Sequence, residues 1–200
     1  MLPFMPFNNL ADDDLTAVIS YLRAQPAVAH TVPEHAPNFG GKVVKAWILT
    51  PKGPEETPAK TMKAAATAVY GEYLANNVAN CVGCHTKVNL RTGEFEGAHF
   101  GGGALHESSK DKNKKFVSPN LTPDTTWGWI TDWSEDMFVA RMKSGRIHDG
   151  SPMPWQSFKN MTDDDLRAIY RYLHALPPSS GGPDPAKRET SLLVNTTTSN

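Results

Sequence analysis

The feature that most constrains this 200-residue chain is a pair of cysteines, Cys81 and Cys84, followed directly by His85. These are the only cysteines in the sequence, and such a pair is typical of a redox dithiol, half of a zinc site or a haem attachment point. Zinc needs two further ligands at matching spacing, and no second Cys-x-x-Cys or His-x-x-x-His follows. A thioredoxin-like dithiol would follow a strand, whereas the residues before Cys81 are predicted to be helical.

Haem attachment fits each fixed position of this motif. Two thiols spaced by two residues can each form a thioether with one haem vinyl group, and His85 is then held under the iron as its first axial ligand. The imidazole must be neutral, and its other ring nitrogen needs an acceptor such as a backbone carbonyl. The sequence therefore predicts one covalent haem c bound by Cys81, Cys84 and His85.

The second axial ligand is expected to be a methionine, because a thioether favours the reduced iron. Met153 is the preferred candidate, since the prolines on both sides of it fix the backbone between two predicted helices. A methionine on a helix more often fills a core than binds iron. The alternatives are Met137, Met142 and Met161 and the histidines His99, His106, His148 and His174, with His148 as the second choice.

Hydrophobic periodicity predicts the helices. Apolar residues at helical spacing predict helices over 12–24, 65–79 and 134–144, and a fourth between the cap Thr162 and Pro177. Residues 88–130 are rich in Gly, Asn, Thr and Pro, and we expect a long loop that wraps a large cofactor.

Residues 66–177 resemble a class I cytochrome c domain of the multihaem, dihaem-type subunits of bacterial periplasmic dehydrogenases. The resemblance lies in Cys81–His85, Tyr70–Leu74, Ser118–Asp124, Trp133–Phe138, Met153–Trp155 and Tyr172–Leu173. It implies an all-α class I fold of helices and long loops around one haem, in which Gly71 and Tyr172 mark a helix crossing. It also implies that Pro119 and Asn120 lie near the haem, although ordinary turn residues would look the same.

The domain organisation follows from an internal repeat. Residues 9–15 align with residues 160–166, and each copy begins a helix with three consecutive aspartates. The second copy alone is preceded by Cys-x-x-Cys-His. We therefore expect a C-terminal fragment of a longer cytochrome: 1–26 as the remnant helix of an upstream cytochrome c domain, 27–64 as an interdomain linker, 65–178 as the cytochrome c domain and 179–200 as a disordered tail.

The resemblance implies an electron carrier, not an enzyme. His85 and Met153 would bind the iron, and electrons would pass from a dehydrogenase to an acceptor such as another cytochrome or an oxidase. It also implies a periplasmic protein whose export signal is not in this chain, with membrane association only through other segments or partners. The alternatives are a peroxidase-like haem enzyme or gas sensor with a labile sixth ligand, and a dithiol oxidoreductase without haem. The net charge of −1 offers no basic surface for nucleic acid.

Overall fold

The structure is a computed structural model that describes residues 6–34, 36–47, 57–89, 92–187 and 193–195. Parts of all four expected segments lie outside these residues: 1–5 of the remnant helix segment, 35 and 48–56 of the linker, 90–91 of the expected cytochrome c domain, and 188–192 and 196–200 of the tail. The chain divides into two compact units, Met1–Met62 and Lys63–Asn200.

The first unit contains η1 (Pro6–Asn9), α1 (Asp12–Arg23) and α2 (Phe39–Trp47), and α1 confirms the helix predicted over residues 12–24. The backbone N–H groups of Asp12 and Asp13 donate to the carbonyls of Ala59 and Lys60, each at 3.0 Å. These bonds satisfy two N–H groups that the first turn of a helix leaves free. Although the sequence of α1 is amphipathic, none of its residues is buried. Its exposed apolar residues are Leu15, Val18, Ile19 and Leu22.

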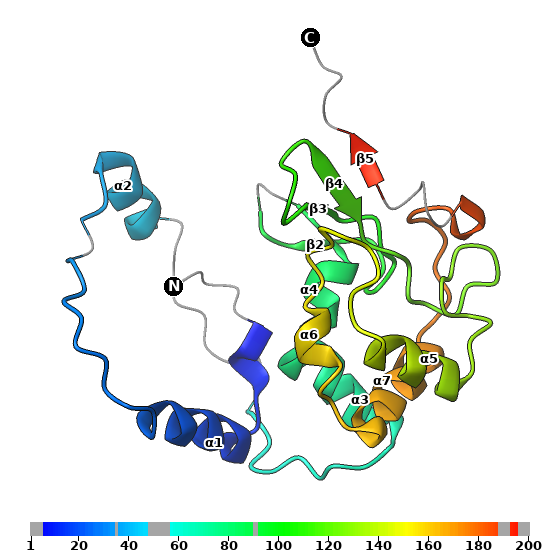
Figure 1. Cartoon of the computed structure of the whole chain (residues 1–200), viewed down its shortest axis with the longest axis horizontal. Helices are drawn as coiled ribbons and strands as arrows, with labels where there is room; N and C mark the ends of the chain where they lie inside the picture. Colours follow the sequence, from blue (N-terminus) through cyan, green and yellow to red (C-terminus); the bar gives the residue numbers. More distant parts are fainter. Residues whose placement is uncertain (1–5, 35, 48–56, 90–91, 188–192, 196–200) are drawn as a thin grey trace. The chain divides into compact units, whose positions relative to one another are not determined.

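The second unit is built from helices at one end and short strands at the other. Figure 1 shows α3, α5 and α7 together, with α4 between them and the strands. The predicted helix over 65–79 appears as α3 followed directly by η2, and the predicted helices near residues 134–144 and 162–177 appear as α5 and α7. The helical elements are α3 (Ala68–Tyr73), η2 (Leu74–Val78), α4 (Cys81–His85), α5 (Glu135–Lys143), α6 (Trp155–Phe158), α7 (Asp163–Ala175) and η3 (Pro185–Lys187).

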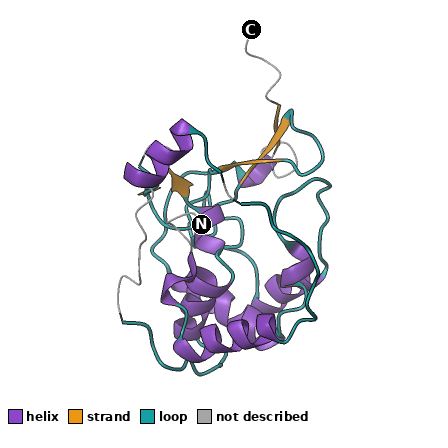
Figure 2. Cartoon of the chain, turned by 90° about the vertical axis from the view of Figure 1, so that its left-hand side faces the viewer, coloured by secondary structure: helices purple, strands orange, loops and turns teal. Residues whose placement is uncertain are grey.

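Two small antiparallel sheets correct the expectation of an all-α fold. One pairs β1 (Lys87–Val88) with β2 (Phe95–Glu96). The other has the order β3-β4-β5, from Leu105–Glu107, Lys114–Val117 and Leu193–Asn195. Four of these strands lie in the stretch predicted as a loop, which Figure 2 shows as short strands joined by long irregular connections. Strands of two to four residues are too short for an alternating apolar pattern to reveal them.

The crossing of α3 and α7 sets the packing of the helical end. A Cβ atom on Gly71 would lie 1.9 Å from the carbonyl oxygen of Ala168, so only a glycine lets the two backbones approach this closely. Gly71 thus lies at the crossing of the two helices, where it meets the backbone of Ala168, one turn before Tyr172 on α7. Tyr172 accepts a hydrogen bond from Asn76 at 3.1 Å and meets the ring of Phe100 edge-on.

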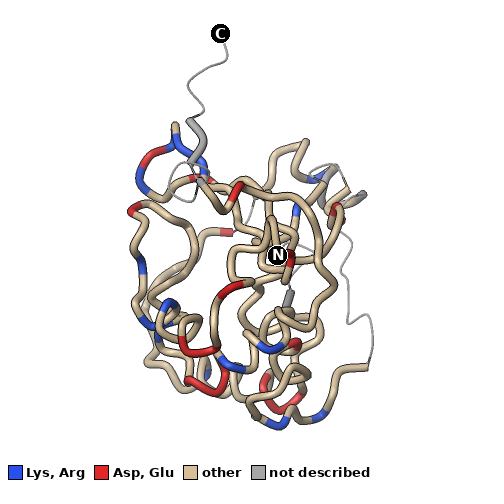
Figure 3. The backbone as a smooth tube through the Cα atoms, turned by 90° about the vertical axis from the view of Figure 1, so that its right-hand side faces the viewer, with Lys and Arg blue, Asp and Glu red and all other residues tan. Residues whose placement is uncertain are grey.

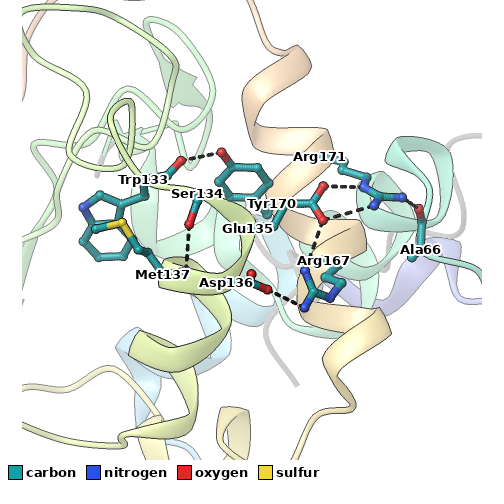
Figure 4. Close-up of polar contacts among 9 residues, drawn as sticks. All are labelled: Ala66, Trp133, Ser134, Glu135, Asp136, Met137, Arg167, Tyr170 and Arg171. Atoms are coloured by element: carbon teal, nitrogen blue, oxygen red, sulfur yellow. Dashed lines mark hydrogen bonds and ion pairs between the residues drawn. The ribbon is translucent and has the colours of Figure 1, made fainter.

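A cap and an ion-pair cluster fix α5 against α7. Ser134 caps α5, as predicted, by accepting a hydrogen bond from the backbone N–H of Met137 at 3.2 Å. Figure 4 shows Glu135 facing Arg167 and Arg171 of α7, with N–O distances of 3.3 and 2.6 Å. The hydrogen bond from Arg171 lowers the pKa of the Glu135 carboxyl. Such exposed pairs stabilise a fold only weakly, so they orient the two helices more than they hold them together.

Described residues after α7 make long-range hydrogen bonds, whereas a disordered tail is expected from residue 179 onward. The backbone N–H of Ser179 donates to Thr122 Oγ1 at 3.1 Å, and the indole of Trp129 donates to the Pro183 carbonyl at 2.9 Å. Further along, β5 pairs with β4. The Gly-, Pro- and Ser-rich composition predicts disorder, but composition does not reveal hydrogen-bond partners that lie far away in the sequence.

The surface carries charges of both signs. Figure 3 shows basic and acidic residues interspersed along the backbone, in keeping with the net charge of −1. None of the described helices has the length and apolar character needed to span a membrane.

The helix crossing yields a first prediction. Gly71→Ala should destabilise the second unit by about 3 kcal/mol, because the added methyl group forces α3 away from α7. Urea unfolding followed by circular dichroism measures this change. Gly40→Ala in α2 is the matched control, since its methyl group would meet its nearest atom at an ordinary 3.7 Å. A Gly71→Ala protein as stable as wild type would contradict the packing described here.

Candidate functional site

The Cys-x-x-Cys-His motif forms its own short helix, α4. The preceding residue, Asn80, adopts a left-handed conformation with φ of 52° and turns the chain from η2 into α4. The Asn80 side chain lies over Gly83, where an added Cβ would come within 2.4 Å of Asn80 Oδ1. Glycine between the two cysteines therefore allows this turn to close.

The C-terminal carbonyls of α4 are satisfied by the loop that follows. A helix leaves its last carbonyl groups without internal partners. The backbone N–H of Gly102 donates to the His85 carbonyl at 2.8 Å, and Nε2 of His106 lies 2.9 Å from the Cys84 carbonyl. The second contact requires the tautomer of His106 that carries its proton on Nε2. Neither contact was predicted from the sequence, although the run of three glycines at 101–103 is a signal for the close backbone approach of Gly102.

The His85 ring is buried and has one defined partner. Its Nδ1 lies 2.9 Å from the backbone carbonyl of Pro119, so Nδ1 carries the proton and donates it. Burial lowers the pKa of His85 to about 4; the hydrogen bond to Pro119 opposes this shift, and the charge of His106 adds to it. The ring is thus neutral near pH 7, and Nε2 keeps the lone pair that a metal ion requires.

The two thiols of α4 have environments that disfavour thiolate chemistry. Burial, with a smaller effect of Cys84, raises the pKa of Cys81 to about 12. Burial also raises the pKa of Cys84 above its usual range. A redox dithiol needs a thiolate stabilised by a lowered pKa. The shifts are in the opposite direction, which argues against the dithiol oxidoreductase alternative.

A layer of glycines packs against the segment that carries the Pro119 carbonyl. Gly102 has φ of +71°, and a Cβ there would lie 2.5 Å from the backbone nitrogen of Asn120. The backbone N–H of Gly103 donates to the Ser118 carbonyl at 2.8 Å. Loop 101–103 therefore touches His85 on one side and residues 118–120 on the other. Of the predicted site residues, Pro119 contacts the His85 ring through its carbonyl, whereas the Asn120 side chain bonds to Thr122, Ser179 and Gly181.

Met153 is half-buried in the segment between α5 and α6. Several contacts shape this segment: Ser109 donates to the Gly150 carbonyl at 2.9 Å, and Arg146 donates to the Ser151 carbonyl. The Arg141 guanidinium lies 3.8 Å from the centre of the Trp155 ring, two residues after Met153. The segment around Met153 is thus held by Arg141 of α5, by Arg146 after α5 and by the backbone of Ser109, as well as by the flanking prolines.

The rival ligands occupy other environments. Met142 is buried on α5 and Met137 is exposed on the same helix. The ring of His174 stacks on Tyr170 with its Nδ1 3.2 Å from the Tyr170 carbonyl. His148 and Met161 are half-buried, and His99 is exposed beside Phe95.

The donor set fits a covalently attached haem better than a bare metal ion. Within the part of the chain that the structure describes, no three side chains of His, Cys, Asp or Glu gather around a common point. A zinc site on Cys81 and Cys84 would therefore lack its remaining ligands. Two thiols and a neutral, hydrogen-bonded imidazole on one helix are what haem attachment requires.

Comparison with known proteins gives several related sequences, although no protein-family model matches the chain. The chain is 29% identical over 192 residues to the cytochrome c subunit of alcohol dehydrogenase (quinone) from Gluconacetobacter polyoxogenes, which covers 88% of this chain and 40% of that protein. It is 33% identical over 123 residues to the fructose dehydrogenase cytochrome subunit of Gluconobacter japonicus, covering 60% and 23%. The gluconate 2-dehydrogenase cytochrome c subunit of Pantoea cypripedii is 33% identical over 113 residues, covering 54% and 23%. The chain thus spans less than half the length of these curated relatives, all of them cytochrome subunits of dehydrogenases.

The contacts around Met153 yield a second prediction. Arg141→Gln should destabilise the second unit by about 1–2 kcal/mol, because the charge over Trp155 and the 2.8 Å hydrogen bond to the Gly145 carbonyl are lost together. Arg141→Lys is the control that keeps a positive charge near the ring. Urea unfolding of the three proteins tests this, and equal stability of the Gln variant and wild type would contradict the assigned role.

Proposed function

We propose that this chain is an electron-transfer cytochrome that binds one haem c covalently through Cys81 and Cys84, with His85 and Met153 as the two iron ligands. The fold proposed around it is that of a class I cytochrome c domain. The observation that carries the proposal is the buried His85 ring, whose Nδ1 donates to the Pro119 carbonyl at 2.9 Å while Nε2 is left for iron. This ring follows directly after two thiols on the same short helix.

Bound haem c would supply a one-electron couple at its iron. The chain's own residues decide how stable each oxidation state is. The hydrogen bond from His85 to Pro119 raises the basicity of the imidazole and fixes its orientation. A Met153 thioether favours the ferrous state, and burial keeps water away from the histidine ligand.

The proposal is for a carrier, not an enzyme, because two protein ligands leave no open position at the iron for a substrate. The rigid segment around Met153 supports a permanently bound sixth ligand. A peroxidase-like enzyme or gas sensor would need that position to be free or easily vacated, so the state of the sixth position separates these functions.

We infer that the electron donor is the catalytic subunit of a dehydrogenase. This inference is supported by the relatives, which are named as cytochrome subunits of alcohol, fructose and gluconate dehydrogenases. We propose another cytochrome or an oxidase as the acceptor. A periplasmic location is proposed because thioether attachment is made outside the cytoplasm in the family that the chain resembles.

A third prediction concerns the attachment. Replacing Cys81 and Cys84 with Ser should abolish covalent haem, because no thioether can form, whereas each single variant keeps one attachment point. Acid–acetone extraction followed by spectroscopy of the protein fraction measures retained haem. His85→Ala should give a misligated or unstable product. Normal haem retention in the double Ser variant would show that the attachment site lies elsewhere.

A fourth prediction concerns Met153. Met153→Ala should open the sixth position, lower the midpoint potential and allow one carbon monoxide to bind per ferrous haem. Met153→His should keep six-coordination and also lower the potential. Met137→Ala, an exposed methionine on α5, is the control and should behave as wild type. An unchanged sulfur-to-iron charge-transfer band in Met153→Ala would assign the ligand to another residue, and carbon monoxide binding by the wild type would favour the enzyme or sensor function.

A further inference from the structure

The last described loop of the chain lies against the segment that carries the Pro119 carbonyl. We call residues 179–183, which follow α7 and precede η3, the C-terminal strap. Nδ2 of Asn120 donates to the Ser179 carbonyl at 2.6 Å and to the Gly181 carbonyl at 3.2 Å. Thr122 Oγ1 accepts from the backbone N–H of Ser179 at 3.1 Å. The buried side chains of Asn120 and Thr122 thus hold the strap.

Asn120 has every polar atom of its side chain engaged. Its Nδ2 binds the strap, and its Oδ1 accepts from the backbone N–H of Thr122 at 2.8 Å and from Thr122 Oγ1 at 2.7 Å. The residue is fully buried, at 0% exposure. In such a setting each lost partner leaves a buried polar group unsatisfied, so the amide plane has one favourable orientation.

Residues 118–120 pack closely against both loop 101–103 and the strap. A Cβ on Gly102 would lie 2.5 Å from the backbone nitrogen of Asn120 and 2.6 Å from the carbonyl carbon of Pro119, distances that exclude a side chain. A Cβ on Gly182 of the strap would lie 3.3 Å from Asn120 Cβ and 3.1 Å from the Gly101 carbonyl oxygen. The peptide between Pro119 and Asn120 is thus packed tightly, and a rotation of its plane would move one of these neighbours.

The strap is also anchored at its far end. The indole nitrogen of Trp129 donates to the carbonyl of Pro183, which is buried, at 2.9 Å. The backbone of Trp129 in turn donates to the Asn120 carbonyl at 2.9 Å. The strap, Trp129 and Asn120 therefore form a closed cycle of hydrogen bonds around the peptide that follows Pro119.

We infer that the C-terminal strap, through Asn120 and Thr122, keeps the Pro119 carbonyl oriented to accept the hydrogen bond from His85 Nδ1, and so helps to set the haem potential. This inference rests on the proposed function, since it concerns His85 as an iron ligand. Asn120 and Thr122 are positioning residues, because they act on the iron ligand only through Pro119. Loosening the strap weakens the His85–Pro119 hydrogen bond, lowers the basicity of the imidazole and favours ferrous iron.

The test compares Thr122→Val with Thr122→Ser in the haem-loaded full chain. Valine has nearly the shape of threonine but removes the hydroxyl that accepts from Ser179 and donates to Asn120. We expect an upward shift of the midpoint potential and at least tenfold faster solvent exchange of the His85 Nδ1 proton in the ferrous protein, measured by NMR. Thr122→Ser keeps the hydroxyl and should restore both values toward wild type.

A second pair of variants keeps the inference testable if Thr122→Val does not fold. Gly182 in the strap and Gly97 outside it both have positive φ, at +87° and +78°, so alanine strains the backbone to a similar extent at either position. An added methyl group meets nothing within 4 Å at Gly97, but it meets Asn120 and the Gly101 carbonyl at Gly182. We expect Gly182→Ala to shift the potential and the Nδ1 proton exchange, and Gly97→Ala, as the matched control, to leave both close to wild type.

Two results would overturn the inference. If Thr122→Val or Gly182→Ala lowers only the unfolding midpoint and leaves both the potential and the His85 exchange rate unchanged, the strap has a purely structural role. In that case the proposed function stands. A wild-type chain that carries no covalent haem would instead overturn the proposed function and the inference together, and this is established before any variant is compared.

Discussion

The α4 helix has only five residues, and its terminal carbonyl groups have no partners within the helix. Contacts from outside α4 must therefore fix the orientation of the His85 side chain. The hydrogen bond from His85 to the Pro119 carbonyl, at 2.9 Å, is the interaction on which the site depends. It places the ring, selects its tautomer and leaves Nε2 to a metal. The long irregular stretch between α4 and α5 brings the Pro119 carbonyl to His85 and packs around it.

Backbone hydrogen bonds and close packing hold that stretch in place, although its strands are only two to four residues long. Loop 101–103 binds the His85 carbonyl and packs on residues 118–120, while β3 brings His106 to the Cys84 carbonyl. Glycines allow the backbones to approach, and the buried Asn120 supplies the polar contacts that a sheet would otherwise provide. The helical end contributes a different kind of constraint, since the α3–α7 crossing at Gly71 packs backbone on backbone.

The relatives and the geometry of the site both support the proposed chemistry. The similarity to cytochrome subunits of dehydrogenases comes from sequence over most of the chain, whereas the neutral His85 with a carbonyl partner comes from geometry. The raised pKa of the buried Cys81 thiol argues against the main competing use of a Cys-x-x-Cys pair. The chain spans less than half of these relatives' length, so the reaction of any larger assembly belongs to the proposal and not to the fold.

The sequence by itself determined what depends on neighbouring residues: the Cys-x-x-Cys-His motif, the helices α1, α5 and α7, and the side-chain caps of α5 and α7. Each is encoded within a few positions, by spacing or by a capping side chain. Pro119 and Asn120 became candidates only through the family resemblance. Only the tertiary structure decided that Ala168 faces Gly71, that His106 contacts the Cys84 carbonyl and that Ser179 lies on Thr122. These contacts join residues far apart in the chain through backbone groups, which every residue carries and no sequence pattern marks.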